Sequence, residues 1–597
     1  MLKRIIKSSL LILGLLISLY LATITIIKAI IDPNDYIDAI KSSLSNNNVR
    51  LTSPIEIRWM SFPSLGLISN DISIASDSQI KGNIDEISVT LNLTSLLTIP
   101  SKGLVGLKFN VDAKDGEISL NSSGVDLPIK VSDLNISLAG VSSELEHLDI
   151  NFTGEILNQF DVKGSANFGK QVSFDDELFV NLSDLNLNID LIDIEGSLNI
   201  NLNKLKIDGN LAIIDLKASE LIAKFKSYFP LLKLPTFKNK SAFSNLSLKS
   251  NFSIEPQGFS KYFHILRVDD QMIEIESETD LKLGTMKTYI QADSINLDKY
   301  STQNTGDNSY EFLLSSMAIP SYIWKQKSVT EINVNKLILG DILSENNLLL
   351  LENTRDVVKV VSLNTNIMGG DINGVGIFNL NSELDFNFRT QTKLIPVKQI
   401  LRALNIPGDL NGFLNSTISL SGSAYNANFS SGNGSFKIEN FSVPGKNIEN
   451  EICEFLQPIS GSNYSSSAKS HTLFDELTGN LSITDDNVRF DNIQTRFGNI
   501  NVKSNGNLDL NNDEYKFNFN ILNKTTRTSE NGCAIPKSFS DLTLPISCAG
   551  ILNQTFLVQQ NCNIDSSILE NLLKKNVIKS MTPRLNSNLE ILKNIFK

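Results

Sequence analysis

The side chains that most often carry out enzyme chemistry are sparse in this sequence. Its only three histidines are His147, His264 and His471, and they lie far apart in the chain. It contains no H-E-x-x-H zinc motif, no G-x-S-x-G nucleophile elbow and no G-x-x-x-x-G-K-[ST] phosphate loop. Carboxylates are abundant, but they alternate with apolar residues or stand at turns, where solvent exposure explains them. We therefore expect no enzymatic activity, no catalytic residue, no metal and no cofactor.

Four cysteines are the other reactive side chains, and all lie in the last quarter of the chain. An even number of cysteines is typical of disulfides in an exported chain, and a tetrahedral zinc site is the alternative. The absence of a C-x-x-C pair favours disulfides. Three pairings are open, and we predict Cys533–Cys548, because a loop of about fourteen residues closes easily. That pairing leaves Cys453 with Cys562.

The composition predicts a folded protein that does not bind nucleic acid. The 597 residues are 41% hydrophobic and 20% charged, which is enough apolar material to bury a core. The formal net charge is −12. Nucleic-acid binding would require clustered lysines and arginines, so we exclude DNA and RNA as partners.

An uncharged apolar run near the N-terminus predicts a transmembrane helix. Residues 8–31 contain this run, from Leu10 to Ile27, and a helix of this length spans about 30 Å, the thickness of a hydrocarbon core. A cleaved signal peptide is the alternative, but the run is long and lacks a small-x-small cleavage site. The positive-inside rule places residues 1–7 in the cytoplasm and the rest of the chain on the far side of the membrane. The residues that set this orientation are Lys3, Arg4 and Lys7.

Most of the remaining sequence alternates between apolar and polar residues, as in β-strands with one buried face. The runs LNLNIDLIDI, SLNINLNKLKID and YKFNFNIL are examples, and the first carries its apolar residues as far as Leu191. Glycine-containing pairs predict tight hairpin turns. An antiparallel meander of roughly thirty to forty strands results. The predicted turns are Asp115-Gly116, Asn373-Gly374, Asn411-Gly412 and Gly432-Asn433-Gly434.

Helical periodicity is confined to a few segments. Short helices are predicted over residues 35–44, 219–229, 396–404 and 450–457. The tail, residues 563–597, is predicted to be an amphipathic helical segment, which either contacts an outer membrane or protein partner or caps the sheet. The polar stretch 301–310 predicts a linker between two strand-rich regions, 32–300 and 311–562.

A sheet of this length has an apolar face that a few helices cannot cover. At about 4.8 Å per strand, it would extend roughly 150 to 190 Å. One solution is for the face to close on itself in separate sandwiches or barrels. The other is an open trough whose apolar face holds a hydrophobic ligand.

Segments at both ends of the chain resemble proteins of the AsmA family. IDPNDYIDAI, followed by SPIEIRWMSFPSLGLISNDISIAS with its W-x-x-[FW]-P-x-L motif, is similar to the start of that family. AIPSYIWKQKSVTEINVNKLILGDILSENNLLLL and NIMGGDINGVGIFNLN resemble the family's C-terminal repeat. The cysteine segments EICEFLQPIS, NGCAIP, LPISCAG and QQNCNID match the family's order. From about residue 79 to residue 330 the resemblance is only one of strand pattern.

The resemblance implies a mainly β fold: an elongated, curved antiparallel β-sheet groove with few short helices and an N-terminal transmembrane helix. Residues 32–300 would form an N-terminal groove that begins with a chorein-like module, and residues 311–562 a second groove with the four cysteines. Family members are similar to bridge-type lipid transfer proteins of the bacterial envelope. A single-pass inner-membrane anchor, a periplasmic body and a phospholipid ligand carried toward the outer membrane, in support of outer-membrane lipid homeostasis, are therefore expected.

The alternating apolar side chains are the candidates for the floor of this groove. Moving two sixteen-carbon chains through water would cost about 25 kcal/mol at about 0.8 kcal/mol per methylene, and a continuous floor lowers that barrier. The alternative is that the same side chains form an ordinary protein core. The candidates are Leu185, Leu187, Ile189, Leu198, Ile200, Leu202, Phe517 and Phe519.

The residues just after the anchor are candidates for the groove mouth. Trp59, Phe62 and Leu65 either line the entrance for lipid or pack against the helix of residues 36–44. The exit turn is predicted to hold the first strands at the membrane surface, and it comprises Asp32, Pro33, Asn34, Asp35 and Tyr36. The alternative function is a non-enzymatic assembly factor for outer-membrane proteins or lipopolysaccharide, acting through exposed strand edges that contact outer-membrane or periplasmic proteins.

Overall fold

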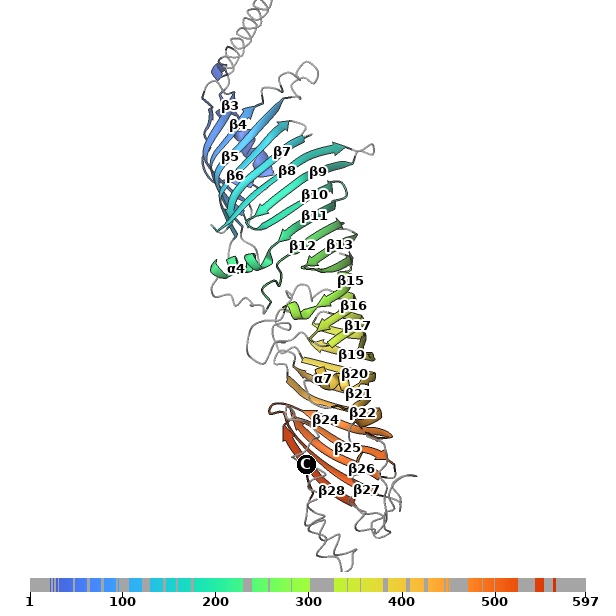
Figure 1. Ribbon diagram of the computed structural model, residues 1–597. Helices are drawn as coiled ribbons and strands as arrows, with labels where there is room; N and C mark the ends of the chain where they lie inside the picture. Colours follow the sequence, from blue (N-terminus) through green and yellow to red (C-terminus); the bar gives the residue numbers. More distant parts are fainter. Residues whose placement is uncertain are drawn as a thin grey trace, which may run out of the picture. The chain divides into compact units, whose positions relative to one another are not determined.

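The computed structural model of the chain is mainly β, with few helices, as predicted (Figure 1). The chain divides into two compact units, and each is described by itself. Unit 1 comprises Met1–Phe229 and Phe243–Asp269, and unit 2 comprises Pro230–Ala242 and Asp270–Lys597. The structure describes residues 22, 25, 28–30, 32–46, 49–61, 65–76, 80–92, 95, 107–120, 129–142, 147–156, 159–172, 177–228, 239–255, 258–280, 282–300, 327–340, 342–354, 356–379, 385–403, 409–423, 428–444, 447–448, 450, 471–485, 487–498, 500–523, 543–551 and 562–564.

Unit 1 contains one long series of strands, and three short helical segments with defined bounds occur among its described residues. The helical segments are the 3-10 helix η1 (Pro33–Tyr36), α2 (Ile37–Asn46) and α4 (Ala218–Tyr228). The strands are β1 (Val49–Leu51), β2 (Ile57–Trp59), β3 (Gly66–Ser76), β4 (Ile80–Leu91), β5 (Lys108–Leu120), β6 (Ile129–Ser142), β7 (His147–Ile156), β8 (Phe160–Val172), β9 (Leu178–Ile189), β10 (Ile192–Asn201), β11 (Lys206–Leu216), β12 (Leu246–Ile254) and β13 (Phe259–Val268).

Unit 2 has the same character, with one 3-10 helix and one α-helix among its described residues. These are η4 (Leu297–Tyr300) and α7 (Val397–Ala403). The strands are β14 (Gln271–Asp280), β15 (Thr285–Asn296), β16 (Lys327–Leu339), β17 (Ile342–Thr354), β18 (Val357–Ile367), β19 (Gly370–Asn379), β20 (Asp385–Pro396), β21 (Asn411–Ser423), β22 (Asn428–Pro444), β23 (His471–Leu473), β24 (Glu476–Thr484), β25 (Asn487–Phe497), β26 (Ile500–Asp509), β27 (Glu514–Asn523), β28 (Thr543–Ile551) and β29 (Cys562–Ile564).

The strands of unit 1 form an antiparallel meander. β1 and β2 both pair with β3, and each later strand pairs with the next one in sequence as far as β13. Figure 1 shows these curved strands side by side. Among the described strands of this unit, no pairing joins β13 back to β1, β2 or β3, so the sheet is open. The predicted meander of hairpins is therefore confirmed here.

Unit 2 departs from the purely antiparallel prediction at one pair of strands. β15 and β16 are parallel, with Ile290 opposite Ile332, whereas every other described pairing in the unit is antiparallel. Residues 301–326 connect the two strands. A parallel pair needs a connection of a dozen or more residues to bring the chain back to the same edge, and a hairpin turn cannot do so.

Four bulges in the strands of unit 1 occur at aspartates with positive φ. The φ angles of four aspartates lie between 49° and 52°, and the strand register shifts at or opposite each of them. These residues are Asp115, Asp133, Asp184 and Asp215. Aspartate tolerates this left-handed conformation better than other residues with a Cβ, because its short polar side chain bonds locally. Each bulge adds one residue, which bends the strand and changes the phase of the alternation.

The predicted glycine turns are wrong. Asp115-Gly116, Asn373-Gly374 and Gly432-Asn433-Gly434 lie inside β5, β19 and β22, and Asn411-Gly412 begins β21. Several strand glycines instead leave room for the aromatic ring of a neighbouring strand. A Cβ on Gly374 would lie 2.8 Å from the ring of Phe388. Such glycine–aromatic pairs cover the gap that a strand glycine leaves.

The predicted short helices are confirmed wherever the structure describes them. The helices predicted over residues 35–44, 219–229 and 396–404 correspond to α2, α4 and α7. Each predicted end differs from the observed end by one or two residues. No helix of the described residues is long and apolar enough to cross a membrane. Most of the predicted anchor (8–31), the linker (301–310), most of the helix predicted over 450–457 and most of the tail (563–597) lie outside the described residues. The first two residues of the tail, 563 and 564, belong to β29 and not to a helix.

Candidate functional site

One row of side chains crosses unit 1 from β2 to β13 on a single face of the sheet. Residues directly opposite one another on paired strands share a face, so the register defines the row. Only Ser69 and Gly164 in it are not hydrophobic. At about 4.8 Å per strand the row is about 53 Å long. Its members are Ile57, Ser69, Ile87, Ala113, Ile136, Phe152, Gly164, Leu187, Ile194, Ile213, Leu248 and Leu266.

The face that carries this row, called here the apolar face of unit 1, also bears five of the predicted floor residues. Leu185, Leu187 and Ile189 lie on β9 opposite Gly196, Ile194 and Ile192 of β10. Leu198 pairs with Leu182, and Ile200 with Val180, on the same face. The five predicted residues are half-buried: their side chains are less exposed than those of surface residues and more exposed than those of core residues.

Two apolar residues at the hairpin ends do not join this face through a strand. The alternation predicted a strand through Leu202, but β10 ends at Asn201, and Leu202 begins a four-residue turn with 43% of its side chain exposed. Leu191 lies with Asp190 in the two-residue turn between β9 and β10. Positive φ at Asp190 lets the chain reverse there, which the alternation alone could not reveal.

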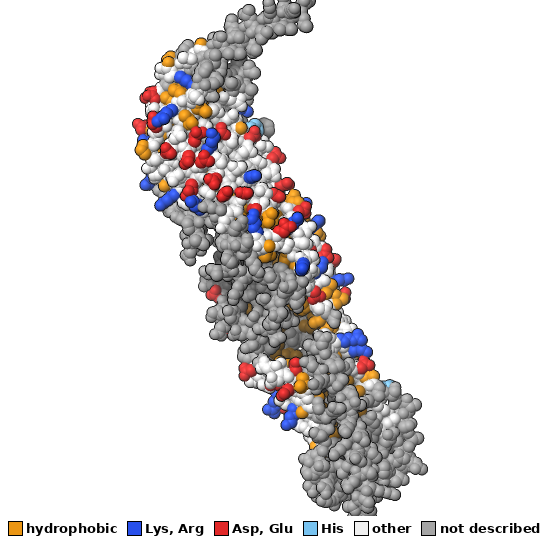
Figure 2. Space-filling view, turned by 60° about the vertical axis from the view of Figure 1, so that its left-hand side comes forward, with side chains coloured by type: hydrophobic (Ala, Val, Ile, Leu, Met, Phe, Trp, Pro, Cys, Tyr) orange, Lys and Arg blue, Asp and Glu red, His pale blue; other side chains and the backbone are white. Residues whose placement is uncertain are grey.

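The opposite face of the same strands is polar. Asn151, Ser165, Asn186 and Glu195 form one row across β7 to β10, and Thr153, Lys163, Asn188 and Asp193 form the next. Figure 2 shows acidic and basic side chains spread over one side of unit 1. An ion pair between Lys114 and Glu86, with 2.8 Å between Nζ and Oε1, joins β5 to β4. Unit 1 is therefore a single layer with one polar and one apolar face.

A similar row crosses unit 2 from β14 to β28. It carries the predicted floor residue Phe517, and Phe519 lies on the same face, opposite Ile546. Aromatic rings gather here: the ring centroids of Phe490 and Phe517 are 5.6 Å apart, and those of Phe517 and Phe519 are 6.2 Å apart. The row comprises Ile275, Ile290, Ile332, Leu349, Leu363, Gly374, Thr390, Ile418, Gly434, Leu481, Phe490, Gly506, Phe517 and Cys548.

The exit turn is bonded to the first strands of unit 1. The Asp32 carboxylate caps η1 by accepting a hydrogen bond from the Asn34 backbone N–H at 2.9 Å. The Asn34 side-chain Oδ1 accepts a hydrogen bond from the Ile57 N–H of β2 at 3.0 Å. Lys28 Nζ donates to the Met60 carbonyl at 2.7 Å. The residues on either side of the turn are thus fixed to β2 and the residue that follows it.

The candidate mouth residues lie where this connection meets the apolar face. Trp59 is opposite Leu67 and belongs to the apolar face, next to the row that begins at Ile57. Leu65 precedes β3, and its carbonyl accepts a hydrogen bond from the Leu91 N–H at 3.0 Å. Phe62 lies outside the described residues. In the exit turn, Pro33 is buried and the Asp35 N–H donates to the Asp32 carbonyl, whereas the Tyr36 side chain lies outside the description.

Only part of the predicted cysteine pairing falls on described residues. Cys548 lies on β28, is 5% exposed, and is not a free thiol. The register places Cys562 of β29 opposite Cys548. Cys453 and Cys533 lie outside the described residues, so the Cys533–Cys548 pairing stays a prediction.

Little in the described part of the chain points to catalysis. No group of three or more histidine, cysteine, aspartate or glutamate side chains that could hold a metal occurs there. His264 lies on the apolar face opposite Ser250, with its ring stacked on Tyr262 at 6.2 Å. Burial lowers the pKa of His264, because the charged imidazolium loses solvation there. The hydrogen bond and charge of Arg58 lower the pKa of Glu56 on the surface.

Sequence reasoning missed the residues that keep the apolar face in phase. In V-S-D-L (131–134) and L-S-D-L (182–185), the bulged aspartate lets the hydrophobic residues before and after it share one face. A change in the phase of the alternation at Ser-Asp was the signal in the sequence.

No family model matches this chain, and no curated protein matches it.

Proposed function

We propose that the protein is a non-enzymatic carrier or conduit for phospholipids, anchored in the inner membrane by residues 8–31, with its body in the periplasm. The observation that carries the proposal is the row from Ile57 to Leu266, in which only Ser69 and Gly164 are not hydrophobic. It begins at the strand bonded to the exit turn and crosses every later strand of unit 1. The lipid-bridge architecture implied by the resemblance to AsmA-family proteins supports the same function.

The physical mechanism is partition between two apolar environments. Acyl chains that lie on the row lose little of the free energy that holds them in a bilayer, about 0.8 kcal/mol per methylene. The half-buried state of Leu185, Leu187 and Ile189 supports this role, because their exposed area is available to a guest. Headgroups would remain in water beyond the edge of the apolar face. Since most side chains of the row are hydrophobic, a lipid could move from strand to strand without leaving that face.

Transport toward the outer membrane, in support of its lipid homeostasis, is part of the proposal. Gly164 in the row of unit 1 and Gly506 in the row of unit 2 do not interrupt these rows, because an aromatic ring covers each glycine. A Cβ on Gly164 would lie 2.2 Å from Phe152, and one on Gly506 would lie 2.3 Å from Phe517. Unit 2 offers a corresponding face, so each unit by itself presents a surface suited to acyl chains.

Photo-crosslinking in cells tests the proposal with matched positions. A photoreactive amino acid at Leu198 lies on the apolar face, whereas the same residue at Asn199 lies on the polar face one position away. We expect phospholipid adducts by mass spectrometry at Leu198 and at Phe519, and none at Asn199 or at Asn520.

The outcome also separates lipid transport from the assembly role. Protein adducts in place of lipid at Leu198 would favour an assembly factor. Equal lipid labelling at Leu198 and Asn199 would show that the adducts come from the surrounding membrane, and the conduit would be rejected.

A further inference from the structure

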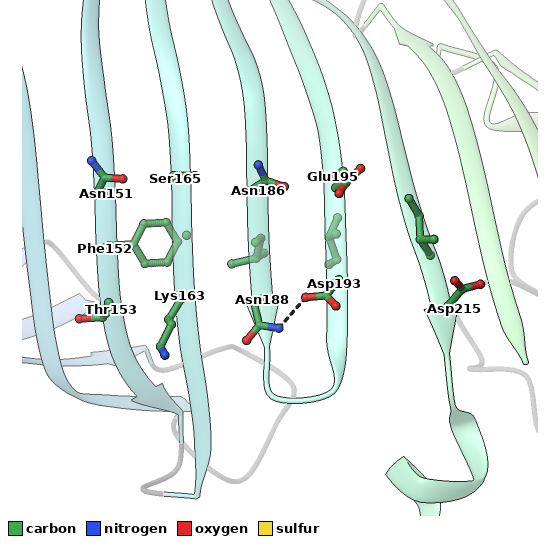
Figure 3. A pocket seen from close by; sticks show the side chains of 14 residues that line it. Asn151, Phe152, Thr153, Lys163, Ser165, Asn186, Asn188, Asp193, Glu195 and Asp215 are labelled. Atoms are coloured by element: carbon green, nitrogen blue, oxygen red, sulfur yellow. Dashed lines mark hydrogen bonds between the residues drawn. The ribbon is translucent and has the colours of Figure 1, made fainter. Parts of the chain in front are cut away.

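A depression of about 590 Å³ lies on the polar face of unit 1. Strands β7 to β11 line it with side chains from the two polar rows described above (Figure 3). The part of the apolar row that crosses these strands has its side chains on the opposite face of the sheet. It comprises Phe152, Gly164, Leu187 and Ile194. The volume of the depression falls within the range of about 300 to 1,000 Å³ that is typical of small-ligand sites. The lipid function makes no use of this face.

The bulge at Asp215 helps to form the depression. Asp215 has φ of +51°, and the register of β11 with β12 shifts between Ile213 and Leu216. Ile213 belongs to the apolar face, so Ile214 points to the polar side, where 43% of it is exposed. Ile214 and Asp215 thereby form one wall of the depression. Ile214 is the apolar side chain of that wall, and it lies beside the carboxylate of Asp215.

Most of the polar side chains in the depression are not engaged by the protein itself. Asn188 donates a hydrogen bond to Asp193 at 2.5 Å (Figure 3). Within the described part of the chain, no hydrogen bond or ion pair engages the side chains of Asn151, Asn186 or Glu195. An amide side chain carries both donors and an acceptor, whereas a carboxylate only accepts. These groups are therefore available to a ligand with several hydroxyl groups.

The charge in the depression narrows the class of ligand. Its charged side chains are Lys163, Asp193, Glu195 and Asp215, so carboxylates outnumber the single cation. This excess of negative charge disfavours phosphates, nucleotides and other anions. Neutral amides and hydroxyls make up the rest of the polar lining, and they pair with hydroxyl groups as well as with water. Ile214 offers an apolar contact to the C–H surface of a sugar ring.

We propose that this depression binds a neutral oligosaccharide. Asn151 and Asn186 would hold adjacent hydroxyls through their amides, Glu195 would accept hydroxyl protons, and Ile214 would contact the ring. The site lies back to back with the lipid row through a single sheet layer. A glycan bound there would hold the protein in place without entering the path of the lipid.

Isothermal titration of the full chain tests the proposal. The protein is kept in a detergent without a sugar headgroup, and chitotriose, cellotriose and maltotriose are the probes. We expect saturable binding of at least one of them below about 10 mM, with 1:1 stoichiometry. N151A/N186A should weaken that binding at least tenfold. N251A, which removes an exposed asparagine of β12 outside the depression, should leave it unchanged.

Two outcomes would overturn the proposal. One is the absence of saturable binding for all three glycans, and the other is equal binding by wild type and N151A/N186A. Competition by spermidine at equal concentration would point to a cation site and would also reject the oligosaccharide. Circular dichroism melts of each variant check that folding is unchanged, and lipid crosslinking at Leu198 reports separately on the lipid function.

Discussion

The apolar face of unit 1 and a cluster in unit 2 show two ways of using the same alternating pattern. The cluster consists of Phe441, Phe474, Phe497 and Ile500, with exposures of 8%, 7%, 3% and 1%. Its rings pack closely in tilted and edge-on arrangements, with 4.9 Å between the centroids of Phe441 and Phe474. On the apolar face, by contrast, residues such as Leu187 remain half-buried. Alternation therefore predicts which side of a strand is apolar, but not whether that side is filled.

The difference comes from what surrounds each set of residues. The cluster draws its members from four places: Phe441 lies on β22, Phe474 lies between β23 and β24, Phe497 ends β25, and Ile500 begins β26. Non-neighbouring segments thus cover one another there, and further hydrophobics such as Leu410 and Ile448 pack against the cluster. The row through Leu187 consists only of neighbouring strands in one layer. We infer that the cluster stabilises the fold, whereas the open row has exposed apolar area that the proposed lipid function would use.

The largest expected effect is on stability at the cluster. I500A removes a side chain that is 1% exposed, and it should lower the free energy of unfolding by about 2 to 5 kcal/mol. I200A, on the open face, should cost only about 1 kcal/mol because its side chain is half-buried. Urea unfolding of both variants measures the difference. Equal losses would mean that the open face is as well filled as the cluster.

The next effect is on lipid and not on stability. L187D places a charge in the middle of the row, where an acyl chain would have to pass it without water. We expect at least a tenfold loss of lipid crosslinking at Leu198, with a melting temperature close to that of wild type. N199D, on the polar face, is the matched control and should retain lipid. If L187D unfolds the protein, the row behaves as a core; if it keeps its lipid, the row is not the path.

The sequence predicted well which residues share one face of a strand, but it predicted poorly where strands end and turns begin. Period-two spacing placed Leu185, Leu187 and Ile189 correctly together, because strand geometry alone fixes their direction. It did not predict the end of β10 before Leu202, since a turn without glycine or proline has no strong local signal. The turn predicted at Gly374 was also wrong, because the ring that fills the space above this glycine belongs to Phe388 on another strand.

Backbone bulges should have a smaller effect, confined to the open face. Asp133 has φ of +49° and lets Val131 and Leu134 share the apolar face. D133V should cost about 1 to 2 kcal/mol, since a β-branched residue is strained in this conformation. D133G adopts it freely, so its stability in urea should stay within about 0.5 kcal/mol of wild type. Equal losses in the two variants would assign the effect to the carboxylate and not to the backbone.

The smallest effect concerns pH, and it too separates the two regions. The open face contains His264, whose pKa is lowered by burial, whereas the cluster contains no titratable side chain. As the pH falls below about 6.5, the unfolded chain takes up a proton that the folded chain does not, so stability is present above that pH and falls on acidification. H264L should therefore lose less of its melting temperature than wild type between pH 7.5 and about 5.5. H147L removes an exposed histidine and should match wild type. An unchanged acid response in H264L would show that other groups govern it, and that the apolar face tolerates a charge at this position.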